Sequence, residues 1–287
     1  RGETPLFMAV MENFDNIVHY LILNGANIHL ATSFDSVTPL MIAISRGHED
    51  VVELLMKHKA NTLVTDRRGW NALMFAVAAN EFSFAQKLLT LETNINRVDK
   101  RGWSCLMLGA EHKDTKILQE IFKYHPQLEI KNEFGHTALL VAAQNGHPES
   151  IRVLLQHGAN IHALDESGRD ILMLAATYGR VTNLKEFAGL HLDLNHQDQR
   201  GQTPLMHAVL GDQLQTVDYF LSLNLDVHQQ DINGRSALML AIKNSSAEIV
   251  KKIYQHKPDL KVKDIHGLNA FDFVKKYQRK DLSSINF

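Results

Sequence analysis

The sequence predicts an all-α solenoid in which stacked helix–turn–helix units are joined by β-hairpin loops. Three recurring features predict this fold: a helix-capping residue, a glycine two positions before the cap, and a small residue inside the helix that follows. The capping residues are all Ser, Thr, Asn or Asp, spaced 34 residues apart once and then 33 residues apart seven times: Thr4, Thr38, Asn71, Ser104, Thr137, Asp170, Thr203, Ser236 and Asn269. Their side-chain oxygens accept a hydrogen bond from the otherwise unpaired N–H groups of a first helical turn, so each one marks the start of a helix.

The residue two positions before the cap is a glycine in eight of the nine units: Gly2, Gly69, Gly102, Gly135, Gly168, Gly201, Gly234 and Gly267. A tight turn with positive φ favours glycine there because glycine has no Cβ. Ser36 is the only departure. In three units a proline follows the cap directly, at the first helical position, where its missing N–H costs no hydrogen bond: Pro5, Pro39 and Pro204.

Each unit contains a second helix after a break such as Gly146. The apolar residues of that helix, for example Ile151, Leu154 and Leu155, have helical spacing, and Gly158 supplies a left-handed stop. A small residue recurs in the first helices, where neighbouring helices must approach closely: Ala9, Ala43, Ala76, Gly109, Ala142, Ala175, Ala208 and Ala241.

These motifs carry a family resemblance. The segments 2–6 (GETPL), 201–205 (GQTPL) and 158–162 (GANIH) resemble the ankyrin-repeat consensus, and Gly146-His147 is similar to its mid-repeat turn. The resemblance covers nearly the whole chain and implies a single ankyrin-repeat domain over residues 1–287, with eight full repeats and a ninth half-repeat as C-terminal cap from about residue 264. It also implies a protein-binding scaffold rather than an enzyme.

The chain departs from the family where a His usually follows Pro-Leu, because methionine takes that position in six units: Met41, Met74, Met107, Met173, Met206 and Met239. Adaptable thioethers could form a binding surface or fill space between helices. We interpret these methionines as packing residues.

Composition excludes several function classes. The apolar fraction of 45% and charged fraction of 22% are those of an ordinary folded protein, and a net charge of −2 gives no global field for sequence-independent binding of nucleic acid or membranes. The single cysteine, Cys105, excludes an internal disulfide and a cysteine-rich zinc site. No nucleotide-binding loop, nucleophile elbow or metal-binding helix occurs, so we expect no catalytic residue, no metal and no cofactor.

Five residues could still carry chemistry. His29, His162 and His228 share one repeat position, and we interpret them as capping residues at the end of the second helix's turn. His207 takes an inward position that is apolar in the other units, which indicates a hydrogen-bonded core histidine more than a functional one. Cys105 beside the cap Ser104 is either a thiolate activated by the helix N-terminus or inert packing, and we take the second interpretation.

Binding is predicted at the hairpin tips, where the repeats vary. The third and fourth tips read Arg67-Arg68-Gly69-Trp70 and Lys100-Arg101-Gly102-Trp103, and Phe134 continues the aromatic line. Aromatic residues beside basic pairs are typical of interface hot spots, although each indole could instead cover its own hairpin. A second predicted surface lies at the ends of the first helices: Glu111, His112, Gln144, Asn145 and Tyr178.

The predicted function is binding of a folded protein, which this chain sequesters, inhibits or recruits through its concave face and hairpin tips. A bacterial self-protection or effector protein and a eukaryotic adaptor both fit, and we expect a monomer when the chain is free. The alternative is binding of single-stranded nucleic acid or an oligonucleotide, with the two tryptophans as stacking platforms.

The two ends give further expectations. A last helix from Phe271 to Lys280 carries a polar surface typical of a terminal cap, without a full second helix after it. Near the other end, apolar Phe7, Met8 and Met11 indicate that a missing segment or a partner covers the first repeat. The chain opens without Met, so we expect an upstream segment that was removed; cytoplasmic localisation is the default, and periplasmic or secreted the alternative.

Overall fold

The fold is built from paired helices and turns. The structure, a computed structural model, describes residues 3–92, 94–187, 189–223 and 225–282. No strand occurs among these residues, and two isolated antiparallel bridges, Val98–Ser104 and Gln230–Ser236, are all that the described hairpins show of β-structure. The predicted all-α solenoid is confirmed. Its repeats fall into two compact units, so the single domain over the whole chain stays a prediction.

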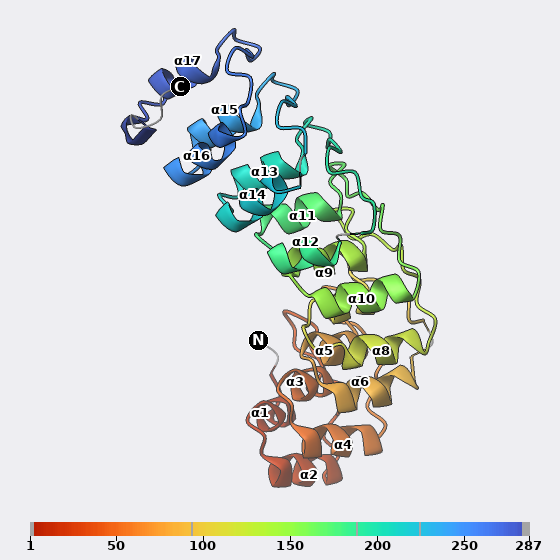
Figure 1. Ribbon diagram of the computed structural model, residues 1–287. Coiled ribbons are helices and arrows are strands. Elements are labelled where there is room, and N and C mark those ends of the chain that lie inside the picture. The colour runs from red at the N-terminus through yellow and green to blue at the C-terminus, as the bar shows by residue number, and fades with distance from the viewer. Residues whose placement is uncertain (1–2, 93, 188, 224, 283–287) are drawn as a thin grey trace. The chain divides into compact units, whose positions relative to one another are not determined.

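The first unit comprises Arg1–Glu133 and Arg152–Ala159. Its first helices pack in the order α1, α3, α5 and α7, and its second helices α2, α4, α6 and α8 lie beside them (Figure 1). The bounds are α1 Pro5–Met11, α2 Asp15–Leu23, α3 Pro39–Ser45, α4 Glu49–Lys57, α5 Ala72–Ala78, α6 Phe82–Leu89, α7 Cys105–Ala110 and α8 Lys116–Phe122.

The second unit comprises Phe134–Ile151 and Asn160–Phe287, and helix α10 (Pro148–Gln156) is divided between the two units. The first helices α9, α11, α13, α15 and α17 pack on one another in chain order, and α12, α14 and α16 form the second row. The bounds are α9 Ala138–Asn145, α11 Ile171–Thr177, α12 Val181–Glu186, α13 Pro204–Leu210, α14 Leu214–Leu221, α15 Ala237–Asn244, α16 Ala247–Gln255, α17 Ala270–Lys276 and the 3₁₀ helix η1 Lys280–Leu282.

All nine predicted caps are confirmed. Each cap residue has extended backbone, and its side-chain oxygen accepts a hydrogen bond from the N–H three residues later. The glycines two positions before the caps that the structure describes all have positive φ, between 67° and 96°. Ser36 adopts φ 57° at the equivalent position, so the exception in the sequence keeps the same turn conformation.

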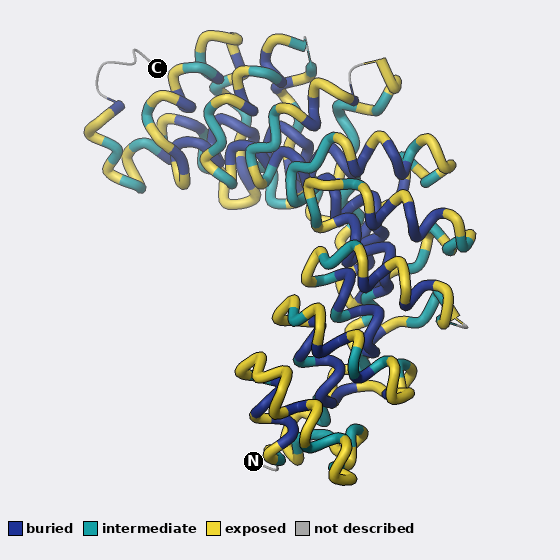
Figure 2. The backbone as a smooth tube through the Cα atoms, turned by 90° about the horizontal axis from the view of Figure 1, so that it is seen from below, coloured by how far each residue is buried: buried dark blue, intermediate teal, exposed yellow. Residues whose placement is uncertain are grey.

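Buried residues run through the middle of each unit, whereas the turns at its edges are exposed (Figure 2). The small residues of the first helices are buried, as expected for sites of close helix approach. The six methionines that follow the caps are at most 1% exposed. Their interpretation as packing residues is therefore confirmed.

The predicted last helix was too long. α17 ends at Lys276 because Gln278 adopts φ 50°, a left-handed conformation that stops a helix. Arg279 is not part of an exposed polar helix either: its Nη1 donates to the carbonyl of Ile242 (2.6 Å) and its Nη2 pairs with Asp281 (2.7 Å). The segment 283–287 lies outside the described residues.

Gly109 offers a test of the repeat packing. A Cβ added there would lie 3.4 Å from Ile121 Cδ1 and 3.5 Å from Leu118 Cδ1, which are ordinary contact distances. Because alanine loses less chain entropy in a helix, Gly109→Ala is expected to raise the free energy of unfolding by about 0.5–1 kcal/mol. Urea unfolding followed by circular dichroism measures this. Gly102→Ala is the control and should lower the free energy of unfolding, because φ is 77° there and the new Cβ would lie 2.8 Å from Asn132 Cα.

Candidate protein-binding surface

The hairpin tips are held by a set of buried aspartates, here called the hairpin aspartates. They recur five positions before the caps: Asp66, Asp99, Asp165, Asp198, Asp231 and Asp264. In each, Oδ1 accepts the backbone N–H groups two and four residues later at 2.8–2.9 Å. These bonds fix the shape of the six tips that contain such an aspartate. Our sequence interpretation overlooked them, although their 33-residue recurrence was a sufficient signal.

Adjacent tips in the first unit are joined through the backbone. The N–H of Arg67 donates to the carbonyl of Asp35, and the N–H of Lys100 donates to the carbonyl of Arg68, both at 2.8 Å. The N–H of Glu133 donates to the carbonyl of Arg101 at the same distance. The basic tips of the third and fourth repeats are thus neighbours joined by a backbone hydrogen bond.

In five of the six hairpin aspartates, all except Asp264, the second carboxylate oxygen binds a side chain, and the donor differs between tips. Arg68 Nε donates to Asp66 at 2.9 Å, whereas Asp99 Oδ2 accepts the indole N–H of Trp70 from the preceding tip at 2.7 Å. The guanidinium of Arg68 lies 4.2 Å from the centre of the Trp70 ring, and Phe75 meets that ring edge-on at 5.5 Å. Trp70 is therefore half-buried and links two repeats, which is a wider structural role than covering its own hairpin.

Trp103 occupies the same repeat position but has a different environment. The residue that corresponds to Asp99 in the next hairpin is Asn132, a carboxamide instead of a carboxylate. The backbone N–H of Trp103 donates to Asp99 at 2.8 Å, but none of the described residues accepts a hydrogen bond from its indole. Its half-buried side chain has a free polar edge, as an interface anchor requires.

The cationic side chains of the third and fourth tips also differ in whether a carboxylate is bound to them. Arg101 forms an ion pair with Glu133 and Arg68 pairs with Asp66. The exposed side chains of Arg67 and Lys100 have no carboxylate partner among the described residues, and the guanidinium of Arg67 lies 5.4 Å from the centre of the Phe34 ring. Arg67 and Lys100 are therefore the charges that remain available to a ligand.

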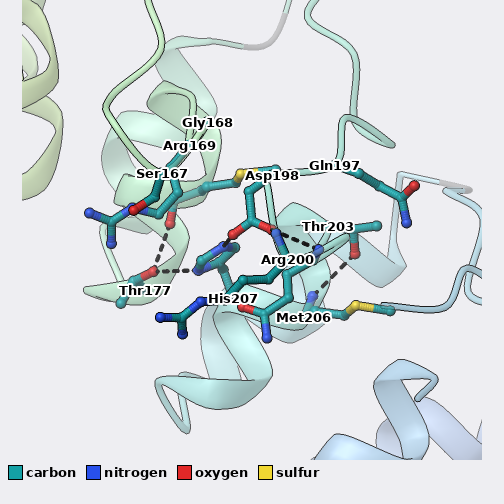
Figure 3. A network of polar contacts seen from close by, with 12 residues as sticks. Ser167, Gly168, Arg169, Thr177, Gln197, Asp198, Arg200, Thr203, Met206 and His207 are labelled. Atoms are coloured by element: carbon teal, nitrogen blue, oxygen red, sulfur yellow. Dashed lines mark hydrogen bonds and ion pairs between the residues drawn. The ribbon is translucent and has the colours of Figure 1, made fainter. Parts of the chain in front are cut away.

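The hairpin aspartate Asp198 is bound by the inward-facing histidine (Figure 3). His207 Nε2 lies 3.0 Å from Asp198 Oδ2, and its Nδ1 lies 3.1 Å from Thr177 Oγ1. The Thr177 hydroxyl also donates to the Met173 carbonyl at 2.9 Å. Burial alone would raise the pKa of Asp198, but the hydrogen bonds with His207 and with the backbone N–H groups of Gln202 and Arg200 together outweigh it and lower that pKa. The interpretation of His207 as a hydrogen-bonded core histidine is confirmed.

Comparison with known proteins identifies the repeat. The sequence family described as ankyrin repeats (3 copies) matches residues 6–99, 106–195 and 172–264, most of the chain. The chain belongs to the ankyrin-repeat family. Ankyrin repeats generally mediate protein–protein interaction, and such scaffolds are typically not enzymes.

Two curated proteins are similar to this chain over only about 70 residues each. The chain is 41% identical over 71 residues to the ankyrin repeat and KH domain-containing protein mask of Drosophila melanogaster, covering 25% of this chain and 2% of that protein. It is 33% identical over 70 residues to the glycerophosphocholine phosphodiesterase GDE1 of Candida albicans, covering 24% of this chain and 6% of that protein. Because the chain spans so little of either relative, their activities do not transfer to it.

The residues predicted to bind at the ends of the first helices belong to both units, and each unit is described by itself. In the first unit, His112 Nε2 lies 2.7 Å from the carbonyl of Val77 and so caps the preceding first helix, while Glu111 is exposed. In the second unit, Asn145 donates to Val141 in its own helix at 3.1 Å. Only Tyr178 of this predicted set is both aromatic and largely exposed, at 43%.

The other predicted members in the second unit are less available. The side chain of Gln144 is half-buried, and the backbone carbonyl of this residue accepts a hydrogen bond from Arg180 Nε at 3.0 Å. Phe134 is 47% exposed and lies 5.9 Å from the ring of His136. Tyr178 and Phe134 remain predicted contact residues of this unit, considered by itself.

The capping interpretation of three histidines was wrong. The residue two positions earlier makes the local turn: Asn27, Asn160 and Asp226 accept the backbone N–H groups of His29, His162 and His228, respectively. The ring of His29 instead accepts a hydrogen bond from the backbone N–H of Asn61 in the following repeat at 3.5 Å. The ring of His228 accepts one from the backbone N–H of Asp259 at 3.3 Å. These rings link consecutive ankyrin repeats.

No group of His, Cys, Asp or Glu that could hold a metal ion occurs among the described residues. Within the same residues, no helix has the length and apolar character needed to cross a membrane.

Cys105 is a packing residue. It is 3% exposed, and burial, with a smaller contribution from Glu92, raises its pKa to about 12. The alternative of an activated thiolate was therefore wrong. We expect the native protein to resist Ellman's reagent at pH 8 and to release one equivalent of chromophore in urea, because only unfolding exposes the thiol. Fast labelling of the native protein would contradict this burial.

Proposed function

We propose that this chain is a non-enzymatic scaffold that binds a folded protein on the tips of the third and fourth repeats. The observation that carries the proposal is the difference between Trp70 and Trp103. The indole N–H of Trp70 is bound by Asp99, whereas Trp103 has a half-buried ring with a free N–H in the same tip as Lys100, whose charge has no partner among the described residues. This combination suits a hot spot whose partner supplies an acceptor for the indole and a carboxylate for the cation.

Binding on this surface is how the chain sequesters, inhibits or recruits its partner. The repeats stack through their buried faces and leave the tips exposed, so a partner on the tips requires no opening of the core. We expect the free protein to be a monomer.

Binding of single-stranded nucleic acid has less support. A stacking platform needs an open ring face, but the guanidinium of Arg68 lies over the Trp70 ring. One of the two platforms in that alternative is therefore covered on one face, and Asp99 holds its indole in place.

The proposal is tested by capture from source-cell extract, after nuclease treatment, on three immobilised baits. The baits are the unaltered protein, Trp103→Ala with Lys100→Ala, and, as a control in the second unit, Ile265→Ala at an exposed apolar residue. A protein that the unaltered and control baits retain, and the double variant loses, supports the assignment. Equal retention on all three baits, or loss of the captured species after nuclease treatment, contradicts it.

A further inference from the structure

A cavity of about 780 Å³ lies between the first and second ankyrin repeats. Its apolar lining is formed by Phe7 and Met11 of α1, Ile42 of α3 and Val37 of the intervening turn. This turn belongs to the one interval of 34 residues, which is a residue longer than the others. The cavity is therefore a local feature of this chain and not a property of every repeat.

The longer turn closes on itself around Thr32. The N–H of Thr32 donates to Val37 at 3.0 Å, the N–H of Ser36 donates to Thr32 at 3.1 Å, and the Thr32 hydroxyl accepts the N–H of Val37 at 3.1 Å. These bonds hold Phe34 outward at 69% exposure, where it lines the cavity edge. The opening is thus built by a hydrogen-bonded turn.

Two exposed carboxylates, Glu3 and Asp35, also line the cavity, and neither forms an ion pair with a described residue. Two cations contact lining residues, but neither forms an ion pair with a carboxylate of the described residues. Arg67 lies over the Phe34 ring, and Arg46 Nη1 donates to the Met11 carbonyl at 3.1 Å. The lining therefore combines an apolar floor with unneutralised negative charge.

This combination discriminates between possible occupants. A neutral apolar side chain would remove water from the carboxylates and give nothing in return, and an acidic side chain would be repelled. A side chain with an aliphatic stem and a cationic head places the stem against Phe7, Met11 and Ile42 while its head remains beside Glu3 and Asp35.

We propose that this cavity binds a lysine or arginine side chain of the protein partner. The proposal rests on the proposed function only in naming a protein as the source of the cation. The partner then presents a basic residue to the cavity between the first two repeats and carboxylates to Arg67 and Lys100 further along. Such alternation of charge fixes the register in which the partner docks.

The test uses three small probes of similar shape: n-pentylammonium, 1-pentanol and pentanoate. Each is titrated into the full chain labelled with ¹³C at the methionine methyl groups, because Met11 lines the cavity and Met239 is buried in the other unit. We expect the Met11 signal to shift saturably and the Met239 signal to stay fixed. Pentylammonium should bind about threefold more tightly than pentanol, as for one partly solvated ion pair, and pentanoate most weakly.

Matched variants separate charge recognition from apolar binding. Glu3→Gln with Asp35→Asn should abolish the preference for pentylammonium, whereas Glu166→Gln with Glu248→Gln removes the same charge from the second unit and should preserve it. Equal binding of pentanol and pentylammonium, loss of the preference in both double variants, or uniform shifts across the methionines would overturn the proposal. None of these outcomes bears on the bait experiment, so the two proposals can fail separately.

Discussion

Substituting Asp165→Asn is expected to lower the free energy of unfolding at pH 7 by about 2 kcal/mol, because it removes a buried charge from its partners. The carboxylate has no exposed area; Arg169 Nε donates to its Oδ2 at 2.7 Å, and His136 Nε2 lies 3.5 Å away. The backbone N–H groups of Ser167 and Arg169 complete its environment. Asparagine can still accept from those two N–H groups, so the substitution reports mainly on the charge.

The loss should depend on pH in a defined window. Burial alone would raise the pKa of Asp165, but the hydrogen bonds with His136 and Arg169 outweigh it and lower that pKa from 3.8 to about 2. A carboxyl with a depressed pKa stabilises the folded state fully above its unfolded pKa and loses that contribution as pH falls toward its folded pKa. The difference between the two proteins should therefore be constant from pH 7 to about 5 and shrink below about pH 4.

Urea unfolding at pH 7, 5, 4 and 3 measures this difference. The control is Asp193→Asn, an exposed aspartate whose Oδ1 accepts the N–H of Asn195 at 2.9 Å. We expect little change for the control at any of these pH values. A loss for Asp165→Asn that is the same at pH 3 and pH 7 would show that the carboxylate contributes through shape rather than through charge.

The repeat itself could be predicted from sequence because each of its signals has a local physical cause. A cap such as Thr137 satisfies first-turn N–H groups within its own turn, and Gly102 supplies a positive φ that its own residue type permits. Such features need no knowledge of the neighbouring repeat. The predicted end of the last helix was wrong because Gln278 has a backbone conformation that is unusual for glutamine. Gln278 is left-handed, and α17 therefore ends earlier than predicted.

The candidate site could be predicted only in part because its chemistry is decided between repeats. Trp70 and Trp103 have equivalent positions and similar neighbours in sequence, and what separates them is the residue across the next turn, Asp99 or Asn132. The ring of His29 likewise finds its partner in the following repeat. The sequence of one repeat does not show which side chain of the next repeat contacts it. Aligning the repeats on the hairpin aspartates would have shown that Asp99 follows Trp70 and Asn132 follows Trp103.

Truncating Trp103→Ala is expected to weaken binding of the identified partner by about 2 kcal/mol or more, roughly 30-fold, while leaving thermal stability nearly unchanged. Its indole N–H has no acceptor among the described residues, so its removal breaks no side-chain hydrogen bond of the free protein. Trp70→Ala should show the opposite pattern. It deprives the buried Asp99 of a hydrogen bond and Arg68 of its ring contact, and should lower the melting temperature clearly.

Isothermal titration with the purified partner and thermal melting of each free variant separate the two roles. Trp70→Phe is the matched control for stability, because it keeps an aromatic ring against Arg68 and removes only the hydrogen bond to Asp99. It should fall between the unaltered protein and Trp70→Ala in melting temperature. If Trp103→Ala melts as low as Trp70→Ala and binds its partner with unchanged affinity, both indoles are structural. The contact surface then moves to the second unit, where Tyr178 is the exposed aromatic residue at a helix end.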